Sequence, residues 1–192
     1  MRQDHNIILD LVEEKSRVLD LGCGEGDLLY LLTSKKQIIG QGIEVNETAI
    51  YKCVEKGLSV FHGDIDSGLN EYPDNSFDYV ILNKSLQEVK KIGYVINEAL
   101  RVGKKVIIGF PNFAHIVSRF QIFFGGKTPV TPSLPYKWHD TPNLHFLSIS
   151  DFWGFCKEKN IKVAKSIYLG ESDKISILPN LFAKEAIFLI EK

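Results

Sequence analysis

The sequence predicts an α/β protein built on a doubly wound, mostly parallel β-sheet. Short runs rich in valine, isoleucine and leucine alternate with segments of helical periodicity through the first 112 residues. These runs are nearly continuous in apolar residues, which is typical of strands buried on both faces by helices. A cluster of glycines follows the first run, at the kind of strand-to-helix turn where such sheets bind ligands. Together these observations favour a layered α/β architecture.

Each element of this first part follows from its local pattern. Strands are predicted where apolar, β-branched residues run together, at residues 17–23, 37–45, 58–65, 77–83 and 104–112. Helices are predicted where apolar side chains recur at helical spacing, at residues 4–15, 27–36, 46–57 and 85–102. Asn46 is expected to cap the third of these helices and Gly57 to end it. Gly93 is expected to interrupt the fourth.

The pattern changes after Pro111. Residues 113–126 again have helical spacing, but four of the seven prolines then fall within residues 126–147. No regular element is expected across that proline- and aromatic-rich insert. A helix over residues 148–160, capped by Ser150 or Asp151, is expected to follow. Two closing strands, expected at 162–169 and 185–192, are predicted to form an antiparallel pair.

Composition bounds the class of protein. The 192 residues suit one domain with one core, and 44% of them are hydrophobic. The formal net charge of −1 argues against a dedicated nucleic-acid-binding protein. No apolar run approaches the roughly 18 residues of a membrane-spanning helix, and the amino-terminal residues do not resemble a signal peptide. We therefore expect a single domain, residues 1–192, that binds neither nucleic acid nor membrane.

The cysteines indicate a reducing compartment. Cys23, Cys53 and Cys156 are odd in number and widely spaced. They form no CxxC pair and no cluster with zinc-ligand spacing, so neither a disulfide framework nor a metal site is predicted. A cytoplasmic location is the expectation.

The glycine cluster reads GCGEG, from Gly22 to Gly26, directly after the first predicted strand. A helix amino terminus behind such a loop presents unpaired N–H groups to a polar or anionic ligand. The spacing is GxGxG, which differs from the GxGxxG of dinucleotide sites, and Glu25 would repel a diphosphate. Asp20, beneath the loop, is placed to bind an ammonium group instead.

Two further acidic residues end the next two strands. Glu44 can accept hydrogen bonds from a ribose diol, and Asp64 can help to recognise an adenine amino group. An ammonium group, a ribose and an adenine together describe S-adenosylmethionine, or its demethylated product S-adenosylhomocysteine. The residues expected to bind it are Asp20, Gly22, Cys23, Gly24, Gly26, Glu44, Val45, Asp64, Ile65 and Asn83.

The segment DLGCGEG resembles the D/E-x-G-x-G-x-G signature of class I S-adenosylmethionine-dependent methyltransferases. That resemblance implies a Rossmann-like sheet of seven strands with an antiparallel closing strand. A narrower similarity, to the methionine biosynthesis protein MetW family, is carried by residues 17–29, 41–46, 63–69, 73–89, 98–115 and 128–152. It implies a role in methionine biosynthesis alongside homoserine O-acyltransferase, with no methyl acceptor generally assigned.

Whether the chain transfers a methyl group is not decided by its motifs. The end of the fourth strand reads ILNKS and lacks the motif by which nucleic-acid and amide N-methyltransferases hold a nitrogen acceptor. No catalytic residue is therefore assigned. The insert offers polar and aromatic candidates, either as a substrate lid or as a protein-docking surface: Tyr136, Trp138, His139, Asp140, Asn143 and His145. His139 and Asp140 could form an acid–base pair, although loop packing is the simpler role for each residue alone.

Residues 113–127 pose a similar choice. Their apolar side chains cover more than one helical face, which favours a core or partner interface. Arg119 and Lys127 are their only cations, so membrane binding would be weak.

Three functions remain open. The favoured one is an S-adenosylmethionine-binding accessory protein of homoserine O-acyltransferase, because the resemblance extends through the insert. A methyltransferase acting on a small molecule is the alternative. A nicotinamide-dependent oxidoreductase is disfavoured by the glycine spacing.

Overall fold

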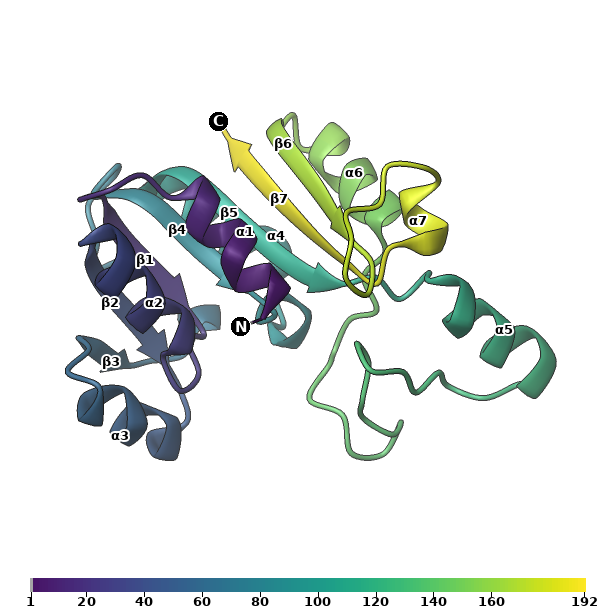
Figure 1. The fold of residues 1–192 in the computed structure, drawn as a ribbon. Helices are drawn as coiled ribbons and strands as arrows, with labels where there is room; N and C mark the ends of the chain where they lie inside the picture. The colour runs from purple at the N-terminus through teal and green to yellow at the C-terminus, as the bar shows by residue number, and fades with distance from the viewer. Residues whose placement is uncertain (1) are drawn as a thin grey trace.

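The computed structural model describes residues 2–192 (Figure 1). Its sheet has seven strands in the order β3-β2-β1-β4-β5-β7-β6. Strand β7 runs antiparallel to both of its neighbours, and the other neighbouring pairs are parallel. The predicted fold class, with its antiparallel closing strand, is confirmed.

The strands are β1 (Arg17–Leu21), β2 (Ile39–Glu44), β3 (Val60–His62), β4 (Phe77–Asn83), β5 (Gly103–Pro111), β6 (Lys162–Leu169) and β7 (Glu185–Glu191). The α-helices are α1 (Gln3–Leu11), α2 (Asp27–Lys36), α3 (Glu47–Glu55), α4 (Ile92–Val102), α5 (Ile116–Gly125), α6 (Ile149–Glu158) and α7 (Pro179–Phe182). Two short 3-10 helices, η1 (Ile65–Ser67) and η2 (Leu86–Glu88), lie on either side of β4 in the chain.

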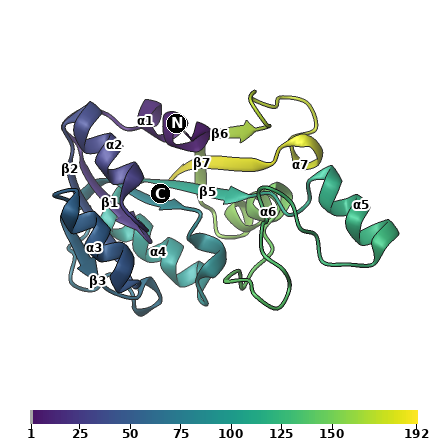
Figure 2. The ribbon, with the colours of Figure 1, turned by 60° about the horizontal axis from the view of Figure 1, so that its bottom comes forward.

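Two apolar clusters hold the layers together. Helices α1 and α2 pack on one face of the sheet, where Ile8, Leu29 and Leu32 are fully buried. Helices α4 and α6 cover the opposite face, where Ile96 and Phe152 are buried (Figure 2). Burial on both faces explains why the central strands are almost continuously apolar.

Three local expectations can be compared with the structure. Asn46 does cap α3, because its side chain accepts a hydrogen bond from the Ala49 N–H at 3.1 Å. The predicted break at Gly93 is wrong, since Gly93 lies within α4 and the helical stretch is interrupted before Ile92. There the Asp66 carboxylate accepts the backbone N–H groups of Lys90 and Lys91, which fixes the chain in a non-helical path.

The cap of α6 also differs from the expectation. Ser148, one turn earlier than Asp151, is the capping residue. Its hydroxyl accepts the Asp151 N–H at 3.1 Å, and the Asp151 carboxylate accepts the Ser148 N–H at 3.2 Å. This reciprocal capping box explains why Ser148 and neither Ser150 nor Asp151 begins the helix.

Helix α5 stands apart from the layers. It projects beyond the end of β5, and the segment 126–147 loops beside it (Figures 1 and 2). That segment contains no helix or strand and has one isolated bridge, between Thr131 and Leu134. In the described part of the chain, no helix is both long and apolar enough to cross a membrane.

Candidate ligand-binding site

The glycine loop lies where β1 and β4 adjoin, at the carboxyl ends of the parallel strands. Gly22 has a φ of +73°, and a Cβ there would lie 2.7 Å from the Cβ of Ser85, so only glycine fits. Gly24 has a φ of +55°, but a Cβ there would meet no atom within 4 Å. The loop is fastened by the N–H groups of Gly22 and Cys23, which both donate to the Ile43 carbonyl. Gly24 therefore faces open space, and the hydrogen bonds to the Ile43 carbonyl hold the loop in place.

Asp20 is a buried carboxylate, with 3% of its surface exposed, and within residues 2–192 its side chain has no hydrogen-bond or ion-pair partner. Burial, with a smaller contribution from the charge of Glu44, raises the pKa of Asp20 to about 7. A buried carboxyl group without a partner lowers the stability of a fold. Such a group therefore indicates a site where a ligand is expected to supply the missing partner. A cationic group in the adjacent hollow would do so.

Glu44 braces the loop. Its Oε2 accepts the Gly24 N–H at 2.8 Å, and its Oε1 accepts the N–H groups of Val45 and Asn46 at 2.9 Å. An ionised carboxylate can accept about four hydrogen bonds. Glu44 thus retains capacity for a ligand hydroxyl while it positions the glycine loop, a second role that its place in the sequence does not reveal.

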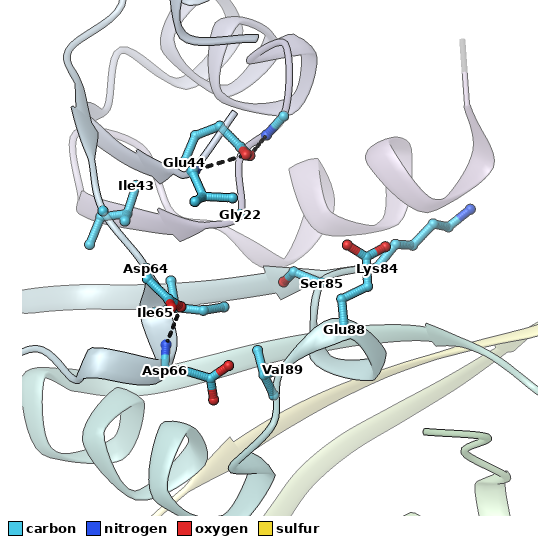
Figure 3. Close-up of a pocket in the computed structure, with 13 residues that line it drawn as sticks. Gly22, Ile43, Glu44, Asp64, Ile65, Asp66, Lys84, Ser85, Glu88 and Val89 are labelled. Carbon is cyan, nitrogen blue, oxygen red and sulfur yellow. Dashed lines mark hydrogen bonds between the residues drawn. The ribbon is translucent and has the colours of Figure 1, made fainter. Parts of the chain in front are cut away.

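Asp64 follows β3 and is exposed. One of its carboxylate oxygens accepts the Asp66 N–H at 2.9 Å and caps η1 (Figure 3). The other carboxylate oxygen makes no hydrogen bond within the described chain. Asp64 and Ile65 line the same hollow as Glu44.

Two adjoining hollows lie around the loop, each with a volume of about 330 Å³. They share Gly22, Gly24 and Lys84. The first contains the predicted residues of β2 and β3, and the second those of β1 and β4. Together the two hollows take in nine of the ten predicted site residues: Asp20, Gly22, Cys23, Gly24, Glu44, Val45, Asp64, Ile65 and Asn83. Gly26 lines neither hollow and is instead the N-cap residue of α2.

Helix α1 contributes residues that the sequence did not single out. Arg2 and His5 line the second hollow, and Asp4 lies beside it. The Asp4 carboxylate accepts hydrogen bonds from Arg2 at 2.6 Å and Asn83 at 3.0 Å, and lies 3.6 Å from the Lys84 ammonium. Burial opposes the ionised form, yet these partners hold the pKa of Asp4 down at about 2. No pattern in the neighbouring sequence predicts this contact, because it depends on how α1 packs.

Lys84, Ser85 and Glu88 also line the first hollow and were not predicted (Figure 3). They directly follow β4, so the rule that ligands bind beyond the carboxyl ends of strands could have found them. Partial burial and the nearby Glu44 raise the pKa of Glu88. Lys84 is paired with Glu185 at 2.7 Å.

Glu25 needs a revised interpretation. Its carboxylate is paired with Lys52, so its charge is partly neutralised and repels a diphosphate less than the sequence implied. The unpartnered Asp20 carboxylate provides that repulsion instead. Burial raises the pKa of the Cys23 thiol above its usual range, so Cys23 acts as a loop residue with no thiolate character. Within residues 2–192, no group of three or more acidic, histidine or cysteine side chains is arranged to hold a metal ion.

The candidate acceptor residues of the insert do not reach this site. None of the six lines either hollow. Tyr136, Trp138 and Asn143 instead border a narrow crevice within the insert itself. His145 touches the site's supporting structure through its N–H, which donates to the Gln87 carbonyl at 3.1 Å. The structure does not place the insert as a lid over the ligand hollow.

Comparison with known proteins gives a family and a fold. The model of the methionine biosynthesis protein MetW family matches residues 2–190. A bifunctional methionine biosynthesis protein MetXA/MetW from Rhodopirellula baltica is 33% identical over 202 residues, covering 98% of this chain and 32% of that protein. The chain spans about one third of the length of the curated relatives it matches.

Solved structures share the fold at low identity. A methyltransferase from Thermotoga maritima, described as S-adenosylmethionine-dependent, has a TM-score of 0.72 at 16% identity, covering 98% of this chain and 87% of that one. The cyclase SpnF has a TM-score of 0.71 at 16% identity, covering 99% and 80%. These two proteins carry different reaction names on one fold, so the fold alone does not fix the chemistry.

Proposed function

The chain belongs to the methionine biosynthesis protein MetW family, and from that premise we propose that it binds S-adenosylmethionine or S-adenosylhomocysteine and acts with homoserine O-acyltransferase as a ligand-responsive accessory protein. Binding of an end product of methionine metabolism would report methionine sufficiency to an early enzyme of the pathway. The ligand would occupy the two adjoining hollows around Gly24.

The observation that carries this proposal is the unpartnered Asp20 carboxylate. S-adenosylmethionine has an α-ammonium group that would supply the missing cation. The ribose hydroxyls would lie at Glu44, and the adenine beside Asp64 and Ile65. The two hollows have volumes within the range of roughly 300–1,000 Å³ typical of small-molecule sites.

Support for the partner comes from the Rhodopirellula baltica relative, which is named a bifunctional methionine biosynthesis protein MetXA/MetW. We infer that its MetXA part corresponds to the homoserine O-acyltransferase. Joined chains of this kind hold their parts at high effective concentration, which favours contact between them.

Cys23, Cys53 and Cys156 are all free thiols in the structure. Free thiols support the proposal that the protein acts in the cytoplasm.

A true methyltransferase is the second candidate, and Glu88 is the observation that favours it. Its carboxylate lines the first hollow with a raised pKa, which suits a general base. In such a reaction an acceptor atom would bond to the methyl carbon as the carbon–sulfur bond breaks. Glu88 would take the proton that the acceptor loses.

Isothermal titration calorimetry tests the ligand. We expect the wild-type chain to bind S-adenosylmethionine and S-adenosylhomocysteine and to give no heat with NADH. Asp20→Asn keeps the shape of the side chain and removes its charge, so it serves as the matched control. Binding of NADH, or equal binding of S-adenosylmethionine by the variant, would overturn the assignment of this site.

A further inference from the structure

Helix α5 carries an exposed aromatic surface that the ligand site does not use. We define the α5 face by Phe120, Phe123 and Phe124, which are 55%, 81% and 72% exposed. Val117 and Ile122 on the same helix are 45% and 44% exposed. A contiguous apolar surface of this kind on a projecting helix is typical of a protein-interaction site. Figures 1 and 2 both show α5 standing clear of the sheet.

The chain segment that leads into α5 is anchored to the body of the protein. Asn112, fully buried just before the helix, donates from its side-chain amide to the carbonyls of Ala183 and Asn180. Within the face, the rings of Phe120 and Phe124 stack with centroids 5.3 Å apart, and Phe123 meets Phe124 edge-on at 4.8 Å. Rings that already pack on one another in the free protein have less conformational freedom to lose when a partner covers them.

The insert is tied to both α5 and the ligand site. The Gln121 side chain accepts the Val130 N–H at 2.8 Å and donates to the Val130 carbonyl at 3.0 Å. At the other end of the insert, the Gln87 carbonyl accepts the N–H groups of Leu144 and His145 at 2.9 and 3.1 Å. Gln87 therefore attaches the insert to η2.

The same 3-10 helix borders the ligand hollow. Glu88, next to Gln87, lines the hollow together with Lys84. The Gln87 side-chain amide donates to the Lys84 carbonyl at 2.6 Å. A ligand that shifts Lys84 or Glu88 would therefore move the point at which the insert is attached. The α5 face and the ligand site are linked through one short element.

We propose that the α5 face, with the adjoining insert, is the surface on which homoserine O-acyltransferase docks, and that η2 couples this contact to the occupancy of the ligand hollow. This inference rests on the partnership proposed above. The Rhodopirellula baltica relative argues for this occupant, because about two thirds of its length lies outside the part that matches this chain. Domains joined on one polypeptide commonly pack on one another through a defined face. The α5 face is aromatic and poor in charge, as the cores of stable interfaces are.

The test uses a double variant and a matched control. Phe123→Ser/Phe124→Ser removes two exposed rings that make no core contact. Tyr51→Ser removes a 69% exposed aromatic ring from α3, at the opposite end of the sheet (Figure 1). Each protein is titrated with the homoserine O-acyltransferase of the same organism, and separately with S-adenosylmethionine.

We expect the double variant to bind the acyltransferase at least about tenfold more weakly, since aromatic anchors dominate interface energetics. Its affinity for S-adenosylmethionine alone should match that of the wild type, and Tyr51→Ser should match the wild type in both titrations. Acyltransferase affinity unchanged in the double variant would overturn the docking surface while leaving the partnership intact. A wild-type chain that does not bind the acyltransferase would overturn both. Light scattering could instead show that the double variant loses a homodimer that the wild type forms, with its acyltransferase affinity unchanged. That result would assign the α5 face to contact with a second copy of the chain and refute the inference.

Discussion

Replacing Asp20 by asparagine should change stability and ligand affinity in opposite directions. The folded protein buries this carboxyl group near the charge of Glu44, and its pKa rises from 3.8 to about 7. A raised carboxyl pKa means that the folded state binds the proton more tightly than the unfolded chain does. The associated stability is fully present below about pH 4 and is lost as the pH rises towards 7.

The magnitude follows from the shift. About three pKa units correspond to roughly 4 kcal/mol at pH 8, taking about 1.4 kcal/mol for each unit. Asparagine still buries a polar amide, so we expect Asp20→Asn to raise the free energy of unfolding at pH 8 by about 1–3 kcal/mol. For a chain of this size, each 1 kcal/mol changes the Tm by roughly 2–4 °C. The increase in the free energy of unfolding should be much smaller at pH 4.5.

Ligand binding should respond in the opposite sense. An ammonium group favours the ionised form of Asp20, whose population in the free protein rises steeply between pH 5.5 and 7. We therefore expect the wild-type affinity for S-adenosylmethionine to rise about tenfold across that interval and to fall again near pH 8, where α-amino groups lose their proton. The Asp20→Asn variant should bind S-adenosylmethionine weakly, and its affinity should not rise between pH 5.5 and 7.

Thermal unfolding and calorimetry at several pH values measure both effects. An Asp20→Asn variant that is less stable than the wild type at pH 8 would refute the claim that the carboxylate is unpartnered. A variant that keeps both the affinity and its pH dependence would refute the placement of the ammonium group.

Three further substitutions test other parts of the account. Glu44→Ala should weaken S-adenosylmethionine binding by about 1–3 kcal/mol in calorimetry, since it removes charge-assisted hydrogen bonds; unchanged affinity would place the ribose elsewhere. Gly24→Val should abolish binding by entering the open hollow, with a stability cost of about 1–2 kcal/mol from its left-handed backbone; a variant that still binds would refute the loop assignment. Ser148→Ala should lower the free energy of unfolding by about 1 kcal/mol through loss of the α6 cap, with ligand affinity unchanged; equal melting temperatures would show that the capping box contributes nothing.

The fold could be predicted wherever the local pattern was sharp. The bounds of β4 and β6 agree with expectation, and each strand ends at the end of its apolar run or one residue later, before Lys84 and before Gly170. The interruption before α4 was misplaced at Gly93 because glycine was the only local signal. The actual cause is the Asp66 carboxylate, which is distant in sequence and reaches this segment only in the folded chain.

The site was predictable to a similar extent. Asp20, Glu44 and Asp64 were found because parallel strands bring their carboxyl ends to one edge of the sheet. The bracing of Gly24 by Glu44 could not be inferred, since it depends on side-chain geometry across two strands. Asp4 was missed for a related reason, because only the packing of α1 brings it to Asn83.

The most direct test of the central claim is a calorimetric titration of the wild-type chain with S-adenosylmethionine, in the absence and then in the presence of saturating homoserine O-acyltransferase. We predict binding in both cases, with a dissociation constant that changes when the acyltransferase is present, because coupling between two sites is reciprocal. A dissociation constant identical in both titrations would contradict the accessory role and favour a methyltransferase. The absence of any binding would contradict the ligand site itself.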